Sequence, residues 1–120
     1  MKRMCISLCL ILLLLFISVE LWGADWRILF KNDDRPVFYD AESVIYPAKD
    51  IGRIWLKVTS EKYYYVFLNE VDCVGRKMRV LSFNTYLNDG QHLFSTSEIT
   101  DWFFIIPGTN FEKIYKMVCK

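Results

Sequence analysis

The chain has few of the residues that enzyme sites use. Among 120 residues it has one histidine, four cysteines, five glycines and three prolines. The histidine, His92, follows a turn-forming Asn88-Asp89-Gly90 sequence, which is typical of a solvated hairpin residue. No serine lies in a recognisable nucleophile motif and no glycine-rich phosphate loop is present. We therefore predict no enzyme activity, no catalytic residue, no cofactor and no metal site.

An excess of charge of one sign is also missing. The chain has 15 Lys and Arg against 14 Asp and Glu, and without Lys2, Arg3 and Glu20 the counts become 13 and 13. A neutral domain lacks the electrostatic footprint of a nucleic-acid binder. Hydrophobic residues make up 53% of the chain and aromatic residues 17%, which excludes a disordered protein. The composition predicts a folded domain with no nucleic-acid partner.

One long apolar run covers residues 4–19 and follows two basic residues. It is shorter than the roughly 20 residues that span a bilayer, and the small residues Gly23 and Ala24 come after it. This pattern predicts a secretory signal peptide, cleaved near Gly23/Ala24, and a location in the periplasm, on the cell surface or outside the cell. The alternative is an uncleaved membrane anchor. The predicted organisation is a signal at 1–23 and a single domain at 24–120, with no integral membrane span after cleavage.

Only two cysteines, Cys73 and Cys119, remain after the predicted signal. In an oxidising compartment, an even and widely spaced pair is typical of a disulfide, whereas a metal site would need four ligands at closer spacing. A bridge that closes 46 sequence steps (119 minus 73) should stabilise a small domain by about 4 kcal/mol. We therefore predict a Cys73–Cys119 disulfide.

The predicted domain consists mainly of short β-branched and aromatic runs separated by turn residues. Ile54, Leu56 and Val58 alternate with polar or amphipathic residues, which indicates a strand with one buried face. In 76–87, strict alternation would place Phe83 and Met78 on opposite faces. Residues 41–46 lack alternation and are expected to form one helical turn. The expected strands are 26–30, 37–40, 53–58, 63–73, 76–87 and 91–95, which gives an antiparallel sheet of about five to six strands.

The C-terminal segment has a helical period. Phe111, Ile114, Tyr115 and Val118 fall at i, i+3, i+4 and i+7, which is the pattern of one apolar helix face. Thr109 and Glu112 are spaced as a capping box at the start of this helix. Cys119 would lie on the apolar face, so the disulfide would hold the last turn against the sheet. The predicted fold class is α+β, an antiparallel sheet with a C-terminal helix tethered by one disulfide.

Two groups of residues are candidates for partner binding. Alternating tyrosines expose at least one ring in any register, and a basic cluster could attract sulfated glycans or acidic protein segments. The competing interpretations are ordinary packing on both faces of the sheet for the tyrosines, and a solvated strand edge, neutralised by Glu70 and Asp72, for the basic cluster. The candidate partner-binding residues are Lys62, Tyr63, Tyr65, Arg76, Lys77 and Arg79.

Several short motifs occur in a fixed order along the predicted domain. They are the strand that begins at Trp26, Val37-Phe38-Tyr39-Asp40 before Ser43-Val44, Ile54-Trp55-Leu56-Lys57, Glu70-Val71-Asp72-Cys73, Arg79, Trp102, Ile106-Pro107-Gly108-Thr109 and the final Cys119. With the signal segment in front, this order resembles the bacterial surface-adhesin protein E family over nearly the whole mature chain. The resemblance implies an antiparallel sheet with a disulfide-tethered C-terminal helix, in agreement with the interpretation of the cysteines above.

The resemblance also implies a function. It suggests a surface-exposed adhesin that binds host extracellular-matrix and plasma proteins, such as vitronectin and laminin, through a basic segment around the first cysteine. Here Lys62, Arg76, Lys77 and Arg79 occupy that region among acidic neighbours. The expected partner is a protein or glycan ligand, and an uncovered strand edge could also pair two copies into a homodimer. The alternative function is a periplasmic structural protein, inhibitor or assembly partner without a host ligand.

Overall fold

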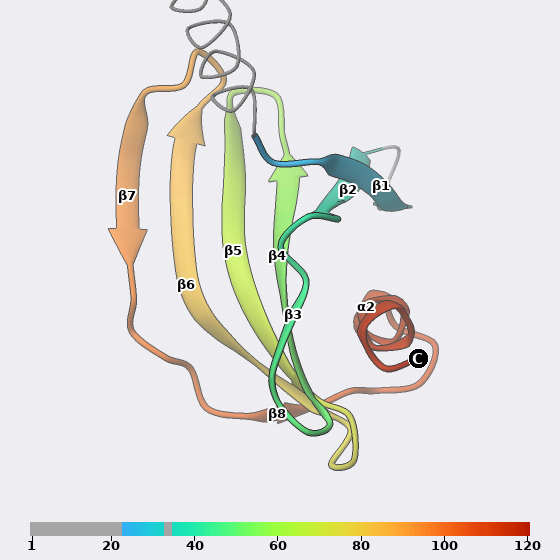
Figure 1. Ribbon diagram of the computed structural model, residues 1–120. Helices are drawn as coiled ribbons and strands as arrows, with labels where there is room; N and C mark the ends of the chain where they lie inside the picture. The colour runs from blue at the N-terminus through green and yellow to red at the C-terminus, as the bar shows by residue number, and fades with distance from the viewer. Residues whose placement is uncertain (1–22, 33–34) are drawn as a thin grey trace, which may run out of the picture.

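The computed structural model of the protein describes residues 23–32 and 35–120. Residues 1–22 of the predicted signal at 1–23 and the turn residues Asp33 and Asp34 lie outside the described residues. Figure 1 shows a curved antiparallel sheet and one C-terminal helix that lies beside it, below β1 and β2. The elements are β1 (Trp26–Asn32), β2 (Arg35–Asp40), β3 (Ile45–Ala48), β4 (Ile51–Thr59), β5 (Tyr63–Asp72), β6 (Lys77–Leu87), β7 (His92–Thr96), β8 (Phe103–Phe104) and α2 (Asn110–Val118).

The described strands form one sheet in the order β1-β2-β4-β5-β6-β7, with β3 also paired to β4 and β8 to β6. The predicted sheet with a tethered helix is confirmed, but the predicted count of five to six strands is wrong, because the sheet has eight. The two strands that were not predicted are β3, whose four residues are all exposed, and β8, which has two residues. Such short segments carry no hydrophobic alternation, so only their pairing identifies them as strands.

The predicted helical turn at 41–46 is also wrong. The chain turns at residues 41–42 and then extends into β3. The carboxylate of Asp40 accepts a hydrogen bond from the Glu42 backbone N–H at 3.1 Å and from the Ser43 hydroxyl at 2.6 Å. Side-chain bonds of this kind stabilise a turn in competition with a helix.

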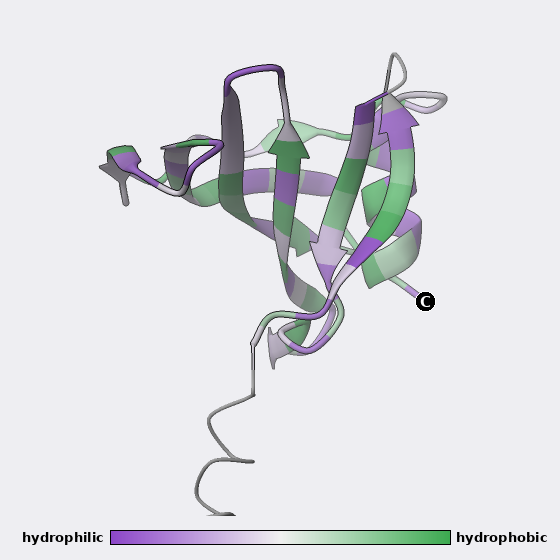
Figure 2. Cartoon of the chain, turned by 90° about the horizontal axis from the view of Figure 1, so that it is seen from above, coloured by the Kyte–Doolittle hydropathy of each residue, from purple (hydrophilic) through white to green (hydrophobic). Residues whose placement is uncertain are grey.

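The sheet has one face against the helix and one face away from it. Ile54 and Leu56 of β4, Val71 of β5 and Met78 of β6 are almost completely buried beneath the helix residue Val118 and its neighbours. We call the face of the sheet that packs against α2 the inner face, and the opposite face the outer face. The predicted alternation in β4 is confirmed, and Figure 2 shows hydrophilic and hydrophobic bands alternating along the strands. The apolar core therefore lies between the inner face and α2.

A β-bulge in β6 changes which residues share a face. The register against β5 shifts at Leu81, because Val80 and Ser82 pair with adjacent residues of β5. An extra residue in one strand displaces the alternation by one position. Met78, which is buried in the core, and Phe83 therefore lie on the same inner face. The predicted opposite placement of these two residues is wrong for this reason.

The helix is attached to the sheet at its C-terminal end. The predicted disulfide is confirmed, with the Cα atoms of Cys73 and Cys119 5.6 Å apart. The Tyr115 hydroxyl donates to the Cys73 carbonyl at 2.7 Å, and the Tyr46 hydroxyl donates to the Val118 carbonyl, also at 2.7 Å. One covalent bond and two hydrogen bonds thus hold the last turn of α2.

The start of the helix differs from its prediction. Thr109 is the N-cap residue, but its hydroxyl donates to the Ile106 carbonyl at 2.6 Å and makes no capping hydrogen bond. The turn through Gly108, which has φ of 82°, brings this nearer acceptor into reach. The Glu112 carboxylate instead lies 3.8 Å from Arg76 and 3.4 Å from Lys116. The predicted capping box is therefore absent from the described structure.

Gly52 of β4 allows the helix to approach the sheet closely. A Cβ atom at this position would lie 2.2 Å from Val118 Cγ1. We expect Gly52→Ala to lower the free energy of unfolding by about 1.5 kcal/mol, because overpacked cores shift side chains and backbone. Urea denaturation measures the change.

The matched control for this prediction is the double variant Gly52→Ala with Val118→Ala, which removes the clashing side chain. Its loss of stability should be smaller than the sum of the two single losses, since the two residues are in contact. A Gly52→Ala protein as stable as the wild type would contradict the close approach.

Candidate partner-binding surface

The predicted binding residues lie toward opposite ends of β5. Lys62 and Tyr63 lie at its start, whereas Arg76 and Lys77 follow the turn at its end. The strand has ten residues, and at 3.3 Å per residue these ends are roughly 30 Å apart. The structure therefore does not bring the tyrosine group and the basic group into one site.

The tyrosine run is largely part of the sheet. Tyr65 is half-buried and stacks on Phe83, with ring centroids 5.7 Å apart. Its neighbour Tyr64 points to the other face and stacks on Tyr86 at 5.0 Å. Tyr63 is 38% exposed, and Lys62 beside it is exposed as well. Of the three rings, Tyr63 is thus the one most available to a partner.

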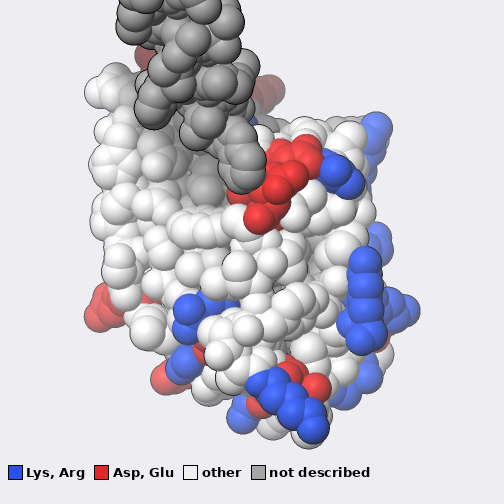
Figure 3. All heavy atoms as spheres, in the orientation of Figure 1, with Lys and Arg blue, Asp and Glu red and all other residues white. Residues whose placement is uncertain are grey.

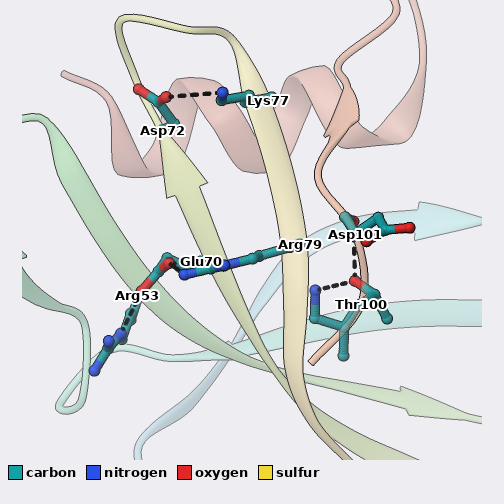
Figure 4. A network of polar contacts seen from close by, with 8 residues as sticks. Arg53, Glu70, Asp72, Lys77, Arg79, Thr100 and Asp101 are labelled. Atoms are coloured by element: carbon teal, nitrogen blue, oxygen red, sulfur yellow. Dashed lines mark hydrogen bonds and ion pairs between the residues drawn. The ribbon is translucent and has the colours of Figure 1, made fainter. Parts of the chain in front are cut away.

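Glu70 is the centre of an ion-pair network on the outer face. Arg53 and Arg79 lie directly opposite Glu70 on the two neighbouring strands, so the cross-strand register brings the three side chains together. Arg53 Nε donates to Glu70 Oε2 at 2.8 Å, and Arg79 Nη2 donates to Oε1 at 2.7 Å. Figure 4 shows the two guanidinium groups on either side of the carboxylate. The side chain of Glu70 is only 5% exposed.

The arginines decide the ionisation of Glu70. Burial alone would raise the pKa of this carboxyl, but the hydrogen bonds and positive charges of Arg53 and Arg79 hold the pKa below its ordinary value. Glu70 is therefore anionic at neutral pH. A charged carboxylate with two guanidinium partners stabilises the pairing of β4, β5 and β6 on the outer face.

Two of the predicted binding cations are engaged within the fold. Arg79 pairs with Glu70 and lies 4.3 Å from the ring of Trp102. Lys77 lies 5.4 Å from the same ring and 3.9 Å from Asp72. Glu70 and Asp72 thus pair with Arg79 and Lys77, whereas the ion pair described for Arg76 is with Glu112. A partner would have to compete with intramolecular contacts for both cations.

Arg76 is more open, and it lies among exposed apolar residues. Its side chain is 52% exposed, 3.8 Å from Glu112 and 4.8 Å from the ring of Tyr115. The Ile105 backbone N–H donates to the Arg76 carbonyl at 3.0 Å, which places the chain from β8 onward beside the β5–β6 hairpin. We call the exposed residues here the hairpin-tip surface, which consists of Val74 (77% exposed), Arg76, Phe104 (77%) and Ile106 (65%).

The hairpin-tip surface has the composition of a protein interface. Single exposed apolar side chains are common on a monomer, but large apolar groups gathered around an arginine are typical of protein interfaces, where aromatic residues and arginine are enriched. A groove of about 340 Å³ next to the disulfide adjoins this surface at Val74 and also contacts Tyr46, Tyr115 and Lys120. The arrangement can bury apolar surface while Arg76 pairs with an acidic group.

Sequence reasoning missed the apolar part of this surface. The signal was the apolar run Phe103-Phe104-Ile105-Ile106, in which alternate residues could be buried. Pairing of β8 with β6 buries Ile105 and turns Phe104 and Ile106 outward. The sequence of this run does not show whether Phe103 and Ile105 or Phe104 and Ile106 face the solvent.

Other groups show no assembled reaction centre among the described residues. His92 is exposed, with Nε2 2.5 Å from the Ser95 hydroxyl oxygen and its ring beside Tyr86. Both cysteines that the structure describes are in the disulfide. In residues 23–32 and 35–120, no three His, Cys, Asp or Glu side chains are grouped so that they could hold a metal ion.

Figure 3 shows how the charged atoms are distributed on one face. Lys and Arg atoms gather along the lower and right-hand parts of this view, a group of Asp and Glu atoms lies at the upper centre, and the left-hand side over β7 is mostly uncharged. Within the described chain, no helix is long and apolar enough to cross a membrane. The fold and the exposed surface define a small disulfide-bonded sheet protein with the features of a binding domain.

Comparison with known families agrees with this description. The family model described as surface-adhesin protein E matches residues 26–120, and the chain belongs to this family. No curated protein and no solved structure matches the chain. Membership supports a surface adhesin, implies an exported protein and suggests a role other than catalysis.

Proposed function

We propose that this protein is an exported, non-enzymatic adhesin that binds an extracellular host protein or glycan through the hairpin-tip surface. The observation that carries the proposal is the 77% exposure of both Val74 and Phe104 beside the partly free Arg76. Family membership supports adhesion as the role of such a surface. An extracellular-matrix protein with an acidic, partly apolar segment has the complementary chemistry.

The disulfide supports this proposal because it restrains the backbone on which the surface is built. Val74 directly follows Cys73, and Arg76 is held through its carbonyl by Ile105. A surface that is ordered before binding loses less conformational entropy when the partner docks. Exposed residues on a restrained turn can therefore contribute most of their contact energy to affinity.

Substitution of the hairpin-tip surface tests the proposal. We expect Phe104→Ala to weaken binding to the matrix partner by about tenfold or more, since a central aromatic contact contributes on the order of 2 kcal/mol. Arg76→Ala should weaken it less and reduce its dependence on salt. Surface plasmon resonance over immobilised matrix proteins, including vitronectin and laminin, measures both effects.

Phe94→Ala, on β7, is the matched control, because it also removes an exposed aromatic ring and lies outside the hairpin-tip surface. It should leave the affinity unchanged. Equal affinities for Phe104→Ala and wild type, or binding to no matrix protein, would overturn the proposal for this surface.

The location of the native protein tests the export part of the proposal. N-terminal sequencing should find a mature chain that begins near Ala24 or Asp25, and protease added to intact cells should digest it. A protein protected inside the envelope would contradict a surface role. It would favour the alternative of a periplasmic structural, inhibitor or assembly partner.

A further inference from the structure

A second hollow lies on the outer face of the sheet, away from α2 and from the hairpin-tip surface. Its volume is about 410 Å³, which is within the range of roughly 300–1,000 Å³ for small-molecule sites. It extends from β1 across β4 to β6. We call it the outer-face groove, and its principal lining residues are Trp26, Asp40, Trp55, Ser82, Asn84 and Tyr86.

Aromatic rings form the apolar part of the outer-face groove, and contacts outside it fix their orientation. Tyr86 stacks on Tyr64 with ring centroids 5.0 Å apart and an interplanar angle of 12°. The Lys57 ammonium lies 4.8 Å from the Tyr64 ring and 5.7 Å from the Trp26 ring. Such stacking and cation–π contacts restrain rings before any ligand arrives. Trp55 adds a further ring from β4.

Hydrogen-bonding groups lie between these rings. The Asn84 amide donates to the Val66 carbonyl at 3.1 Å and to Ser82 Oγ at 3.2 Å, and its oxygen accepts from Ser95 at 2.6 Å. These three bonds hold the amide in one orientation. Among the described hydrogen bonds, Ser82 Oγ accepts from Asn84 and donates to no group, so its proton is free for a ligand.

Asp40 supplies a fixed acceptor at the edge of the groove. Burial would raise the pKa of this carboxyl, but hydrogen bonds from the Ser43 hydroxyl and from the backbone N–H groups of Asp25 and Glu42 lower it. The side chain is therefore ionised. Its Oδ2 accepts one bond, from Ser43 at 2.6 Å, and a carboxylate oxygen can accept a second.

The combination of flat apolar faces and fixed polar groups identifies a class of ligand. An aliphatic molecule would cover Asp40 and Asn84 without replacing their water, which is unfavourable. An anionic molecule would face the Asp40 carboxylate, and none of the described residues that line the groove is Lys or Arg, since Lys57 contacts the Trp26 and Tyr64 rings but is not part of the lining. Sugar rings present C–H faces for stacking and hydroxyl groups for hydrogen bonds. We propose that the outer-face groove binds an uncharged saccharide, with ring faces on Trp55 and Tyr86 and hydroxyls on Asp40 and Ser82.

Titration of the purified secreted chain with neutral oligosaccharides tests this proposal. The probes are maltotriose, cellotriose and chitotriose, with heparin fragments as the charged comparison. Tryptophan fluorescence and amide chemical shifts report binding, and we expect at least one neutral probe to shift the groove residues at millimolar concentration. Trp55→Ala should weaken binding by about tenfold and Ser82→Ala by about threefold. Trp55→Phe, which keeps an aromatic face, should retain most of the affinity.

Two matched variants separate this site from the hairpin-tip surface. Phe104→Ala should leave saccharide binding unchanged, and Ser82→Ala should leave binding to the matrix protein unchanged. If Trp55→Ala does not fold by circular dichroism, Ser82→Ala and Trp55→Phe decide the result. The proposal is overturned if no neutral probe binds, if only heparin fragments bind, or if affinity is equal in wild type and Ser82→Ala.

Discussion

Replacing both Cys73 and Cys119 by alanine is expected to lower the free energy of unfolding by about 4 kcal/mol. The loop between them spans 46 positions, and opening it returns conformational entropy to the unfolded chain. Small domains have total stabilities of roughly 5–15 kcal/mol, so this loss would remove a large part of the stability. Guanidinium denaturation of the oxidised wild type and the variant gives the difference.

The local effect of removing the disulfide should appear in the helix. Tyr115 and Tyr46 still hold the last turn of α2 by hydrogen bonds, but two such bonds contribute only about 1 kcal/mol each. Hydrogen exchange should therefore accelerate in α2 more than in β5. Treatment of the wild type with a reducing agent is the control and should reproduce the variant. A variant that loses less than about 1 kcal/mol would contradict the tether as a major source of stability.

Glu70→Ala is expected to cost about 3 kcal/mol of folding stability. The substitution leaves Arg53 and Arg79 facing each other without the carboxylate that both contact. Removing one partner of a buried ion pair costs about 3–5 kcal/mol, and the lower end applies because the two arginine side chains are 36% and 30% exposed. Urea denaturation measures the loss.

The matched control for this carboxylate is Asp72→Ala, which removes the partner of Lys77 on the same face. That pair is longer, at 3.9 Å, and more exposed, and Asp72 also accepts a hydrogen bond from the Gly75 backbone N–H at 2.9 Å, so Asp72→Ala should cost about 1 to 1.5 kcal/mol, less than Glu70→Ala. Equal losses of folding stability for Glu70→Ala and Asp72→Ala would contradict a larger contribution from the ion-pair network around Glu70.

The same network determines how stability depends on pH. The folded pKa of Glu70 lies below that of the unfolded chain, which is about 4.3, so its contribution is complete above that pH. It is lost as the pH falls through the lower, folded-state pKa. The folded pKa of Asp40 is also lowered, and its contribution is lost in the same direction. Glu70→Gln should therefore lose less stability than wild type between neutral and acidic pH, and parallel curves would contradict this assignment.

Part of the fold was predictable because it depends on local periodicity. The alternation of Ile54 and Leu56 with polar neighbours determines which face of β4 is buried, and the spacing of Ile114 and Val118 does the same for α2. Hydrophobic burial is strong enough to make such a period visible in the chain. The two cysteines that follow the predicted signal likewise predicted the disulfide.

The candidate sites depend on register, which local periodicity does not contain. The Glu70 network exists because Arg53 and Arg79 meet Glu70 across two strand pairs, and Arg76 is the most exposed side chain of the cluster Arg76, Lys77 and Arg79. The exposure of Phe104 follows from the pairing of β8 with β6. The first placement depends on contacts between residues that are distant in sequence. The second depends on which of several neighbouring and equally apolar residues the pairing buries.

By itself, the sequence determined the mainly antiparallel sheet, the C-terminal helix and the disulfide, because each rests on a repeat or a pairing rule within the chain. Only the tertiary structure decided the strand count, the shift of faces at Leu81 and the residues that remain exposed. The physical reason is that a bulge shifts every following side chain to the other face, while short edge strands are stabilised by hydrogen bonds to neighbours rather than by their own hydrophobic pattern.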